Sequence, residues 1–391
     1  MDDGPVRKDF LVFGSPLIGE EEIQEVVDTL RSGWIGTGPK TQRFEAAFAQ
    51  YIGCQHAIAL NSCTAGLELA LVAAGIGEGD EVITTPMTFA ATANVIVHQR
   101  AVPVLADVEP DTFNIDPARL GERITPRTRA IIPVHFAGHP CDMGPIAALA
   151  RQHGLTVIED AAHATESWYR GRKVGTLSDM TAFSFYVTKN LTTGEGGMIT
   201  TDCDDYAERL RVLRLHGLSR DAWKRYSASG FVPYDVTEAG YKFNMTDMQA
   251  ALGIHQLARL ESLLPIRERH ARRYDEAFAG RPELITPVVR DDVRHARHLY
   301  CVLLRLERLG VDRLEFLKAL ERENIGCAIH FVALHLHPFY RERYGFRCGD
   351  FPNAEFVSDR VLSLPLSAKL TDADVEDVIR AVTKVVHRYA R

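Results

Sequence analysis

An alternation of short apolar runs with helical patterns, in the first half of the chain, restricts the fold more than any other feature. Four runs, at residues 81–85, 102–106, 130–134 and 155–160, are almost continuously apolar. Strands of this kind, separated by helices, are typical of a parallel sheet that is covered on both faces. The pattern therefore predicts an α/β fold in which ligands bind beyond the carboxyl ends of the strands.

A helix is predicted before this region, at residues 19–31. Its apolar residues share one helical face, and Gly33 follows as a C-cap. The face consists of Ile23, Val26, Val27 and Leu30. We expect an amphipathic helix that leads into a loop.

The pattern changes near residue 246. Thr246 and Gln249 have the spacing of a capping box and open a helical pattern that runs to about Ala279. Pro265 lies inside this pattern and is expected to kink or break the helix.

The C-terminal third predicts a smaller α+β unit. Strands are expected at residues 298–306 and 326–331, and helices at residues 312–323 and from Thr371 onward. We therefore expect a large α/β domain at residues 1–250, a long connecting helix at 251–280 and a small C-terminal α+β domain at 281–391.

Composition excludes several kinds of partner. The net charge of −7 and the absence of a long basic run argue against nucleic acid, and no stretch approaches the roughly 18 apolar residues of a membrane span. The seven cysteines are odd in number and form no CxxC pair, which favours a reducing cytoplasm. His135, His139 and Cys141 fall in a strand-to-helix loop and not on one helical face, so no metal site is expected.

Two residues carry a pattern that points to chemistry. Asp160 ends an apolar strand, and Lys189 stands between another apolar strand and the glycine-rich turn at 192–197. Pyridoxal phosphate requires a lysine amine for a Schiff base and an anion that keeps its pyridine nitrogen protonated. A desolvated pocket would lower the pKa of the lysine and make the amine nucleophilic. From these two residues alone, a helix-capping Asp160 and a surface Lys189 explain the pattern equally well.

Four segments carry a resemblance to a known family. In chain order they are SGWIGTGPKTQRFE, VIEDAAHA, SFYVTKNLTTGEGG and GYKFNMTDMQAALG. They resemble the fold-type I sugar aminotransferases of the DegT/DnrJ/EryC1/StrS family, and the resemblance runs from about residue 10 to the C-terminus. GYKFN, IHF and PFYRERYGF are most similar to the UDP-4-keto-pentose (ArnB-type) branch.

The resemblance implies roles for four residues around the cofactor. Lys189 would hold pyridoxal phosphate as a Schiff base and transfer a proton between substrate and cofactor, and Asp160 would pair with the pyridine nitrogen. His163 would lie near the ring face or its phenolic oxygen, although a lone histidine after a strand is more often structural. Phe89 would stack on the ring, although without the resemblance it would be assigned to the core.

The resemblance also implies a phosphate site. Residues 61–66 precede a helical pattern, so the amides of Thr64 and Ala65 would face the anion, and Ser184 matches the family's phosphate-binding serine. A further ligand comes from the second subunit of a homodimer, whose active sites lie at the subunit interface. Lys242 and Asn244 both stand in that segment, and the sequence leaves open which of them reaches the phosphate.

Four residues are implied in substrate binding. Trp34 and Lys40 belong to a glycine-rich loop that suits a sugar or a diphosphate. His330 matches a substrate-side position, although a buried or capping histidine explains it equally well. Arg225 is a further diphosphate ligand in this interpretation.

The resemblance implies an aminotransferase that takes an amino group from L-glutamate and delivers it to a keto group of a nucleotide-diphosphate sugar, with pyridoxamine phosphate as the intermediate form of the cofactor. C-4 is favoured over C-3. A dehydratase of the same fold typically has histidine in place of the lysine, so Lys189 argues against it. A non-catalytic sugar sensor would show a degraded site, yet Asp160, Ser184 and Lys189 are all present.

Overall fold

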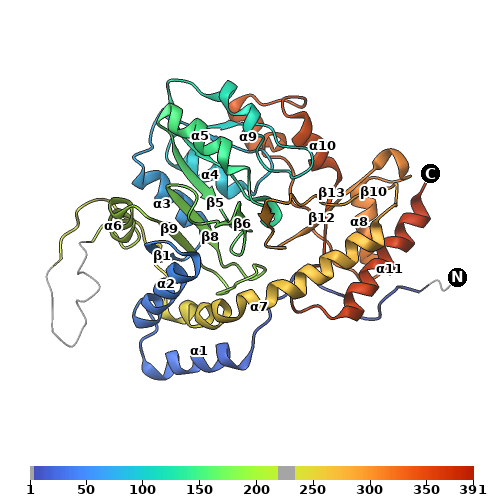
Figure 1. Cartoon of the computed structure of the whole chain (residues 1–391), viewed down its shortest axis with the longest axis horizontal. Coiled ribbons are helices and arrows are strands. Elements are labelled where there is room, and N and C mark those ends of the chain that lie inside the picture. Colours follow the sequence, from blue (N-terminus) through green and yellow to red (C-terminus); the bar gives the residue numbers. More distant parts are fainter. Residues whose placement is uncertain (1–3, 219–233) are drawn as a thin grey trace.

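A seven-stranded sheet forms the centre of the protein in a computed structural model that describes residues 4–218 and 234–391 (Figure 1). Its order is β1-β9-β8-β5-β4-β2-β3. The strands are β1 (His56–Leu60), β2 (Glu81–Thr84), β3 (Val102–Leu105), β4 (Thr128–Ile132), β5 (Thr156–Asp160), β8 (Met180–Ser184) and β9 (Gly197–Thr201). From β3 to β8 all neighbours are parallel, whereas β9 is antiparallel to both β8 and β1. The predicted α/β fold is confirmed, and the four apolar runs form β2 to β5.

Helices cover both faces of this sheet, which explains why its strands are apolar on both sides. On one face, side chains such as Ile58, Ile132 and Ile158 pack against α3 (Cys63–Ala73), α4 (Ala90–His98) and α6 (Asp204–Leu213). The other face packs against α2 (Pro39–Ile52), α5 (Met143–His153) and a long helix, α7 (Asp247–Phe278). Within the described residues, no helix combines the length and the apolar character needed to cross a membrane.

The long helix α7 begins at the predicted capping box and continues past Pro265. The hydroxyl of Thr246 accepts from the amide of Gln249, and the side-chain oxygen of Gln249 accepts from the amide of Thr246. Pro265 does not break the helix, which continues to Phe278. Proline removes one hydrogen bond of the ladder, but the helix is buried on both sides of Pro265, at Leu263 and Leu264 before it and at Arg267 after it, and this packing keeps it continuous.

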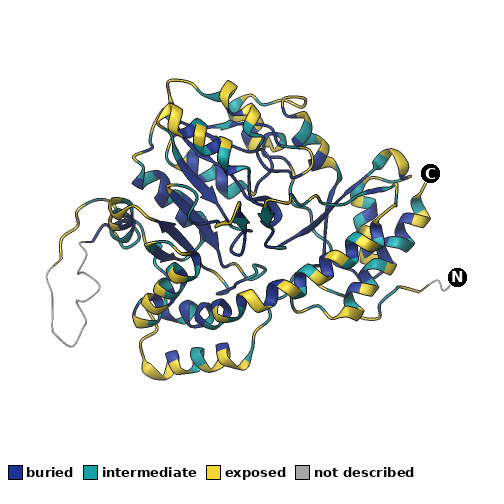
Figure 2. Ribbon diagram, in the orientation of Figure 1, coloured by how far each residue is buried: buried dark blue, intermediate teal, exposed yellow. Residues whose placement is uncertain are grey.

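Helix α1 (Glu20–Ser32) lies beside α7, and Gly33 caps it with a φ of 73° (Figures 1 and 2). Its predicted apolar face is only partly used, because Ile23 and Leu30 are exposed, at 48% and 56%. Glu22 and Thr29 are buried instead, and Glu22 accepts from Gln256 of α7 at 2.8 Å. Polar contacts with α7 therefore set the orientation of α1.

A second sheet of three strands, in the order β10-β12-β13, forms the centre of the C-terminal part. Its elements are β10 (Leu284–Ile285), β12 (Tyr300–Leu304) and β13 (Val361–Leu364), packed against α8 (Arg313–Arg322) and α11 (Asp372–Tyr389). The predicted strand at 326–331 is wrong, because only Ala328 forms a bridge, with Ser363. Strand β13 occupies the edge of β12, and residues 329–331 turn toward a cavity instead.

Two further helices, α9 (Pro338–Tyr344) and α10 (Pro352–Arg360), complete the C-terminal part, and a third, small sheet joins it to the rest of the chain. The small sheet joins β6 (Trp168–Tyr169) and β7 (Arg172–Lys173) with β11 (Val293–Arg294), so it links the two parts of the chain.

The first residues of the chain pack against its last third, although the sequence placed all of 1–250 in the large domain. The amide of Val6 donates to Glu323 at 2.8 Å, and the amide of Leu11 donates to the carbonyl of Asn324 at 2.8 Å. Arg7 forms ion pairs with Asp374 and with Asp377 of α11.

Candidate active site

A cavity of about 610 Å³ opens beyond the carboxyl ends of β5 and β8. This is the position that a parallel sheet predicts for a ligand. Seven of the predicted site residues line it: Thr64, Phe89, Asp160, His163, Ser184, Lys189 and His330.

Lys189 follows β8 on a short turn in which its amide donates to the carbonyl of Tyr186 at 2.9 Å. Burial lowers the pKa of Lys189 to about 8, while the nearby Cys63 and Asp160 act in the opposite direction. A larger fraction of the amine is therefore neutral, and nucleophilic, near pH 7 than in a free lysine.

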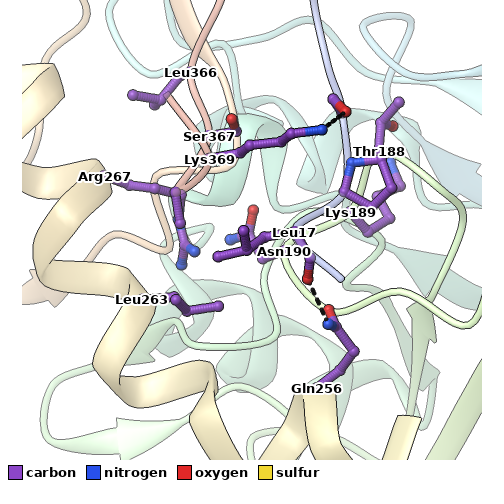
Figure 3. A pocket seen from close by; sticks show the side chains of 13 residues that line it. Leu17, Thr188, Lys189, Asn190, Gln256, Leu263, Arg267, Leu366, Ser367 and Lys369 are labelled. Carbon is purple, nitrogen blue, oxygen red and sulfur yellow. Dashed lines mark hydrogen bonds between the residues drawn. The ribbon is translucent and has the colours of Figure 1, made fainter. Parts of the chain in front are cut away.

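The far side of Lys189 faces a second cavity of about 30 Å³, bounded by the N-terminal segment, α7 and residues 366–369 (Figure 3). Two hydrogen bonds cross its wall: Lys369 donates to Ser15 at 2.8 Å, and Gln256 donates to the carbonyl of Leu17 at 2.9 Å. Three separate parts of the chain therefore meet around the small cavity beside Lys189.

Asp160 ends β5 and is only 5% exposed. Its carboxylate accepts from the Thr92 hydroxyl at 2.8 Å and from the Ala162 amide at 3.1 Å. Burial raises the pKa of Asp160, and these hydrogen bonds and Lys189 oppose the rise. The two hydrogen bonds and the charge of Lys189 therefore offset part of the cost of burying the charged carboxylate.

Thr92 contacts Asp160 although no sequence pattern points to it. Its hydroxyl also lies 2.8 Å from the hydroxyl of Thr88. Because Thr92 has one proton and gives it to Asp160, Thr88 must be the donor to Thr92. The two threonines form a directed chain of hydrogen bonds that ends on the carboxylate.

His163 stands three residues after Asp160 and lines the same cavity. Its Nδ1 accepts from the amide of Ala137 at 3.3 Å, so the ring proton lies on Nε2. Burial, together with the positive charge of Lys189, keeps the pKa of His163 well below its usual value. His163 is a neutral imidazole that offers an N–H donor.

The start of α3 and the end of β8 place hydroxyl groups and backbone amides together. Thr64 and Ser184 line the cavity, as predicted. Ala65 does not line it, because its amide caps the helix by donating to the Ser62 hydroxyl at 3.1 Å. A helix N-terminus with hydroxyl groups suits an anion such as a phosphate.

Gly197 allows this arrangement. A Cβ atom at this position would lie 2.4 Å from the carbonyl carbon of Ser62 and 2.6 Å from the amide nitrogen of Cys63. Only glycine lets β9 approach the turn before α3 so closely.

Phe89 presents its ring to the cavity and is 65% exposed. Its assignment to the core, considered from the sequence alone, is wrong. The ring centroid lies 6.1 Å from that of Phe331, so the cavity has an aromatic wall.

The substrate residues predicted at 33–40 lie outside this cavity, as does Asn244. Trp34 donates to the carbonyl of Thr37 at 3.0 Å, and Lys40 pairs with Glu25 at 2.8 Å. Asn244 donates to the Thr37 hydroxyl at 2.6 Å. The glycine-rich loop and the segment at 240–247 therefore form one surface, apart from the cavity of their own chain.

His330 does line the cavity, and its Nδ1 lies 2.8 Å from the Ser363 hydroxyl. Burial and Lys189 lower the pKa of His330 to about 4. Arg225 lies outside the described residues.

His298 is a cavity residue that the sequence analysis missed. Its ring centroid lies 4.6 Å from that of His163. A lone histidine before an apolar strand has no distinguishing pattern, and only the folded chain brings it to the site.

The histidines and cysteine at 135–141 have protein partners. His135 bonds Glu159 at 2.7 Å, His139 lies 2.8 Å from the carbonyl of Pro140, and Cys141 donates to the carbonyl of Val134 at 3.2 Å. Over residues 4–218 and 234–391, no three histidine, cysteine or acidic side chains are grouped to bind a metal.

The cavity residues fit pyridoxal phosphate. They supply an amine with a lowered pKa, a buried carboxylate, an anion site at a helix N-terminus and an exposed aromatic ring. These are the groups that the aldehyde, the pyridine nitrogen, the phosphate and the ring face require.

Comparison with known proteins agrees with this assignment. The sequence matches the DegT/DnrJ/EryC1/StrS aminotransferase family over residues 16–383. It is 54% identical to the spore coat polysaccharide biosynthesis protein SpsC of Bacillus subtilis over 381 residues, which cover 97% of this chain and 98% of SpsC.

Solved structures extend the similarity to the fold. Spr1654 of Streptococcus pneumoniae, assigned as a sugar aminotransferase, is similar in its pyridoxal phosphate form with a TM-score of 0.90 and 35% identity, covering 97% of this chain and 99% of that one. Helicobacter pylori PseC, an aminotransferase involved in the biosynthesis of pseudoaminic acid, gives a TM-score of 0.90 at 28% identity, covering 97% and 100%.

These matches confirm the predicted family, fold class and cofactor, since Spr1654 has been solved in both its pyridoxal phosphate and its pyridoxamine phosphate forms. The ArnB-type branch stays a prediction. The chain is a pyridoxal phosphate-dependent aminotransferase and belongs to the DegT/DnrJ/EryC1/StrS family.

Proposed function

We propose that the protein transfers an amino group from L-glutamate to a keto group of a nucleotide-diphosphate sugar, at C-4 of the sugar. The observation that carries the proposal is the cavity in which Lys189, with a pKa near 8, shares a wall with the buried carboxylate of Asp160. A sugar acceptor is supported by SpsC, which is named for polysaccharide biosynthesis, and by PseC, which is named for pseudoaminic acid biosynthesis.

Pyridoxal phosphate, when bound, supplies an electron sink and carries the amino group between the two substrates. Thr64, Ser184 and the start of α3 would bind its phosphate, and Phe89 would cover one face of its ring. Asp160 would hold the proton on the pyridine nitrogen, because its carboxylate accepts two hydrogen bonds and would pair with the positive charge of the protonated ring.

Lys189 has two tasks in this proposal. Its neutral Nζ would hold the cofactor, and in the presence of substrate the same atom would act as the base and acid that moves the proton at the reacting carbon. A pKa of about 8 suits both directions of this proton transfer near neutral pH. Because both half-reactions use one lysine in one cavity, the donor product leaves before the sugar is aminated.

The test is a panel of UDP- and dTDP-linked 3-keto and 4-keto sugars, incubated with L-glutamate and analysed by mass. We expect a mass change that corresponds to exchange of the keto oxygen for an amino group with a 4-keto sugar. Lys189→Ala should abolish it, and Asp160→Asn should lower turnover by roughly 100-fold or more with the fold retained. Amination at C-3, or no amination of any sugar in the panel, would overturn the proposed acceptor.

We also propose a homodimer with shared active sites, located in the cytoplasm. The surface formed by residues 33–40 and 240–247 lies outside the cavity of its own chain, which supports its use by a second copy. The exposed side chains of Ile23 and Leu30 support an interface near α1. All seven cysteines are free thiols, which supports a reducing compartment.

Mixing two inactive variants tests the sharing. Lys189→Ala chains and Asn244→Ala chains, once subunit exchange is shown by mass, should together recover part of the activity, because one hybrid site is intact. Full exchange without any recovery would contradict the shared site.

A further inference from the structure

The backbone of a single residue, Ala137, holds two histidines of the cavity. The amide of Ala137 donates to Nδ1 of His163 at 3.3 Å. The carbonyl of Ala137 accepts from the amides of His298 and Leu299, both at 3.2 Å. The two imidazole rings lie with their centroids 4.6 Å apart, and both line the cavity.

The protonation of His298 follows from its partner Asn190. The side-chain nitrogen of Asn190 lies 3.0 Å from a carboxylate oxygen of Glu166 and 2.9 Å from the carbonyl of Ala296. Both are acceptors, so this end of the amide must be the NH₂ group. The amide oxygen is then the atom 3.2 Å from Nδ1 of His298, and it can only accept, so Nδ1 carries the ring proton.

The orientation of Asn190 is itself fixed. Glu166 is fully buried, and its other carboxylate oxygen accepts from Arg267, which is 2% exposed. Arg267 and Asn190 lie on the side of Lys189 that faces away from the large cavity (Figure 3). These buried hydrogen bonds from Asn190 and Arg267 to Glu166 hold the amide of Asn190 in one orientation.

The second ring nitrogen of His298, Nε2, therefore bears a lone pair. It has no hydrogen-bond partner among the residues of the described part of the chain, and His298 lines the cavity. Burial and the positive charge of Lys189 keep the pKa of His298 well below its usual value, so the ring is neutral. His163 has the opposite arrangement, with its proton on Nε2. The two neighbouring rings thus present one donor and one acceptor.

The lone pair on Nε2 of His298 would interact differently with the two substrates of the proposed reaction. L-Glutamate brings two carboxylates, which are acceptors themselves, and an ammonium group whose nitrogen is the reacting atom. A keto sugar brings hydroxyl groups beside its ketone, and each hydroxyl can donate to a lone pair. We propose that His298 accepts a hydrogen bond from a hydroxyl group of the sugar substrate, held for this purpose in one tautomer by Asn190. The inference rests on the proposed sugar acceptor.

Measuring the two half-reactions of the holoenzyme separately tests the role. His298→Asn keeps an N–H group for Asn190 at the position of Nδ1 and removes Nε2. We expect kcat/KM of the sugar half-reaction to fall roughly 10- to 100-fold, as for loss of a hydrogen bond to a buried group, with the glutamate half-reaction changed less than about threefold. The control is His295→Asn, which removes an equally buried imidazole that does not line the cavity. Equal losses in both half-reactions, or no loss in either, would overturn the assignment.

Nitrogen-15 NMR of the histidine-labelled holoenzyme tests the tautomer without any turnover. At neutral pH we expect His298, assigned by comparison with His298→Asn, to carry its proton on Nδ1 alone. A proton on Nε2 would overturn the inference. Because this measurement needs no sugar, it separates a wrong tautomer from a wrong choice of sugar acceptor.

Discussion

The centroids of the imidazole rings of His163 and His298 lie 4.6 Å apart, and both residues hydrogen-bond the backbone of Ala137. Ala137 has a φ of 56°, in the left-handed region that residues with a side chain rarely adopt. The backbone at this turn is therefore strained where it positions two cavity side chains, a pattern that is common at functional sites.

The pH dependence of cofactor attachment should report the pKa of Lys189. Only the neutral amine attacks the aldehyde of pyridoxal phosphate, so below the pKa the rate should rise about tenfold per pH unit. Because the pKa of Lys189 is about 8, the rate should level off above that pH. Stopped-flow absorbance of apoprotein mixed with pyridoxal phosphate measures it.

A second lysine provides the control for this profile. Burial also lowers the pKa of Lys173 to about 8, but its ammonium donates to the carbonyl of Tyr51, away from the cavity. Lys173→Arg should leave the profile unchanged. A rate that still rises tenfold per unit at about pH 10, as for an ordinary lysine, would contradict the lowered pKa.

Thr92→Val should destabilise the charged form of Asp160. The variant keeps the shape of the side chain and removes the donor that lies 2.8 Å from the carboxylate, at a cost of about 1.5–3 kcal/mol in the free energy of unfolding. The folded-state pKa of Asp160 is already raised by burial and should rise further. The loss should therefore be present at neutral pH and shrink as the pH falls through that pKa.

Urea unfolding of the apoprotein across this pH range measures the effect. Thr88→Val is the matched control, since it leaves the bond from Thr92 to Asp160 in place, and it should cost about 1 kcal/mol or less. Equal losses of unfolding free energy in the two variants would show that the hydrogen bond from Thr92 to Asp160 contributes no more than the one between the threonines.

Gly197→Ala should disturb the anion site. The added methyl group would lie 2.4 Å from backbone of Ser62, which must shift, so we expect a loss of about 1–3 kcal/mol in unfolding free energy and weaker binding of the cofactor phosphate. Thermal unfolding and titration with pyridoxal phosphate measure the two effects. Gly77→Ala is the comparison, because a Cβ atom there meets no neighbour within 4 Å; similar losses at the two positions would refute the steric explanation.

Glu166→Gln should be strongly destabilising. It leaves Arg267, which is 2% exposed, as a buried charge without its partner, and breaking a buried pair in this way costs about 3–5 kcal/mol. Chemical denaturation of the apoprotein measures the loss. Glu315→Gln removes one member of the exposed pair with Arg322 and should leave the free energy of unfolding almost unchanged. A loss for Glu166→Gln that is no larger than this would mean that Arg267 finds another partner.

The sequence was sufficient for the elements whose signal is local. Continuous apolar runs identified β2 to β5, and the capping box identified the start of α7, because burial and helix capping leave patterns within a few residues. The strand predicted at 326–331 was wrong because strand pairing depends on residues that are distant in sequence. Its composition suits a strand, but whether it pairs depends on β13, which lies more than thirty residues away and takes the edge of β12.

The site divides in the same way. Lys189 and Asp160 stand at strand ends, where topology alone predicts a ligand. His298 reaches the cavity only because its backbone bonds the turn at 136–138, and Thr92 only because helix α4 brings it to β5. Contacts between segments so distant in sequence have no pattern that a single sequence can show.

The contact between the first residues and the last helix has a consequence for synthesis. Val6, Arg7 and Leu11 bind residues that lie beyond position 320, and the partners of Arg7 belong to α11. Chains are made from the N-terminus, so residues 6–11 must wait for these contacts until their partners have been synthesised. The central sheet can assemble while translation continues, but the contacts of Arg7 form only once α11 has left the ribosome.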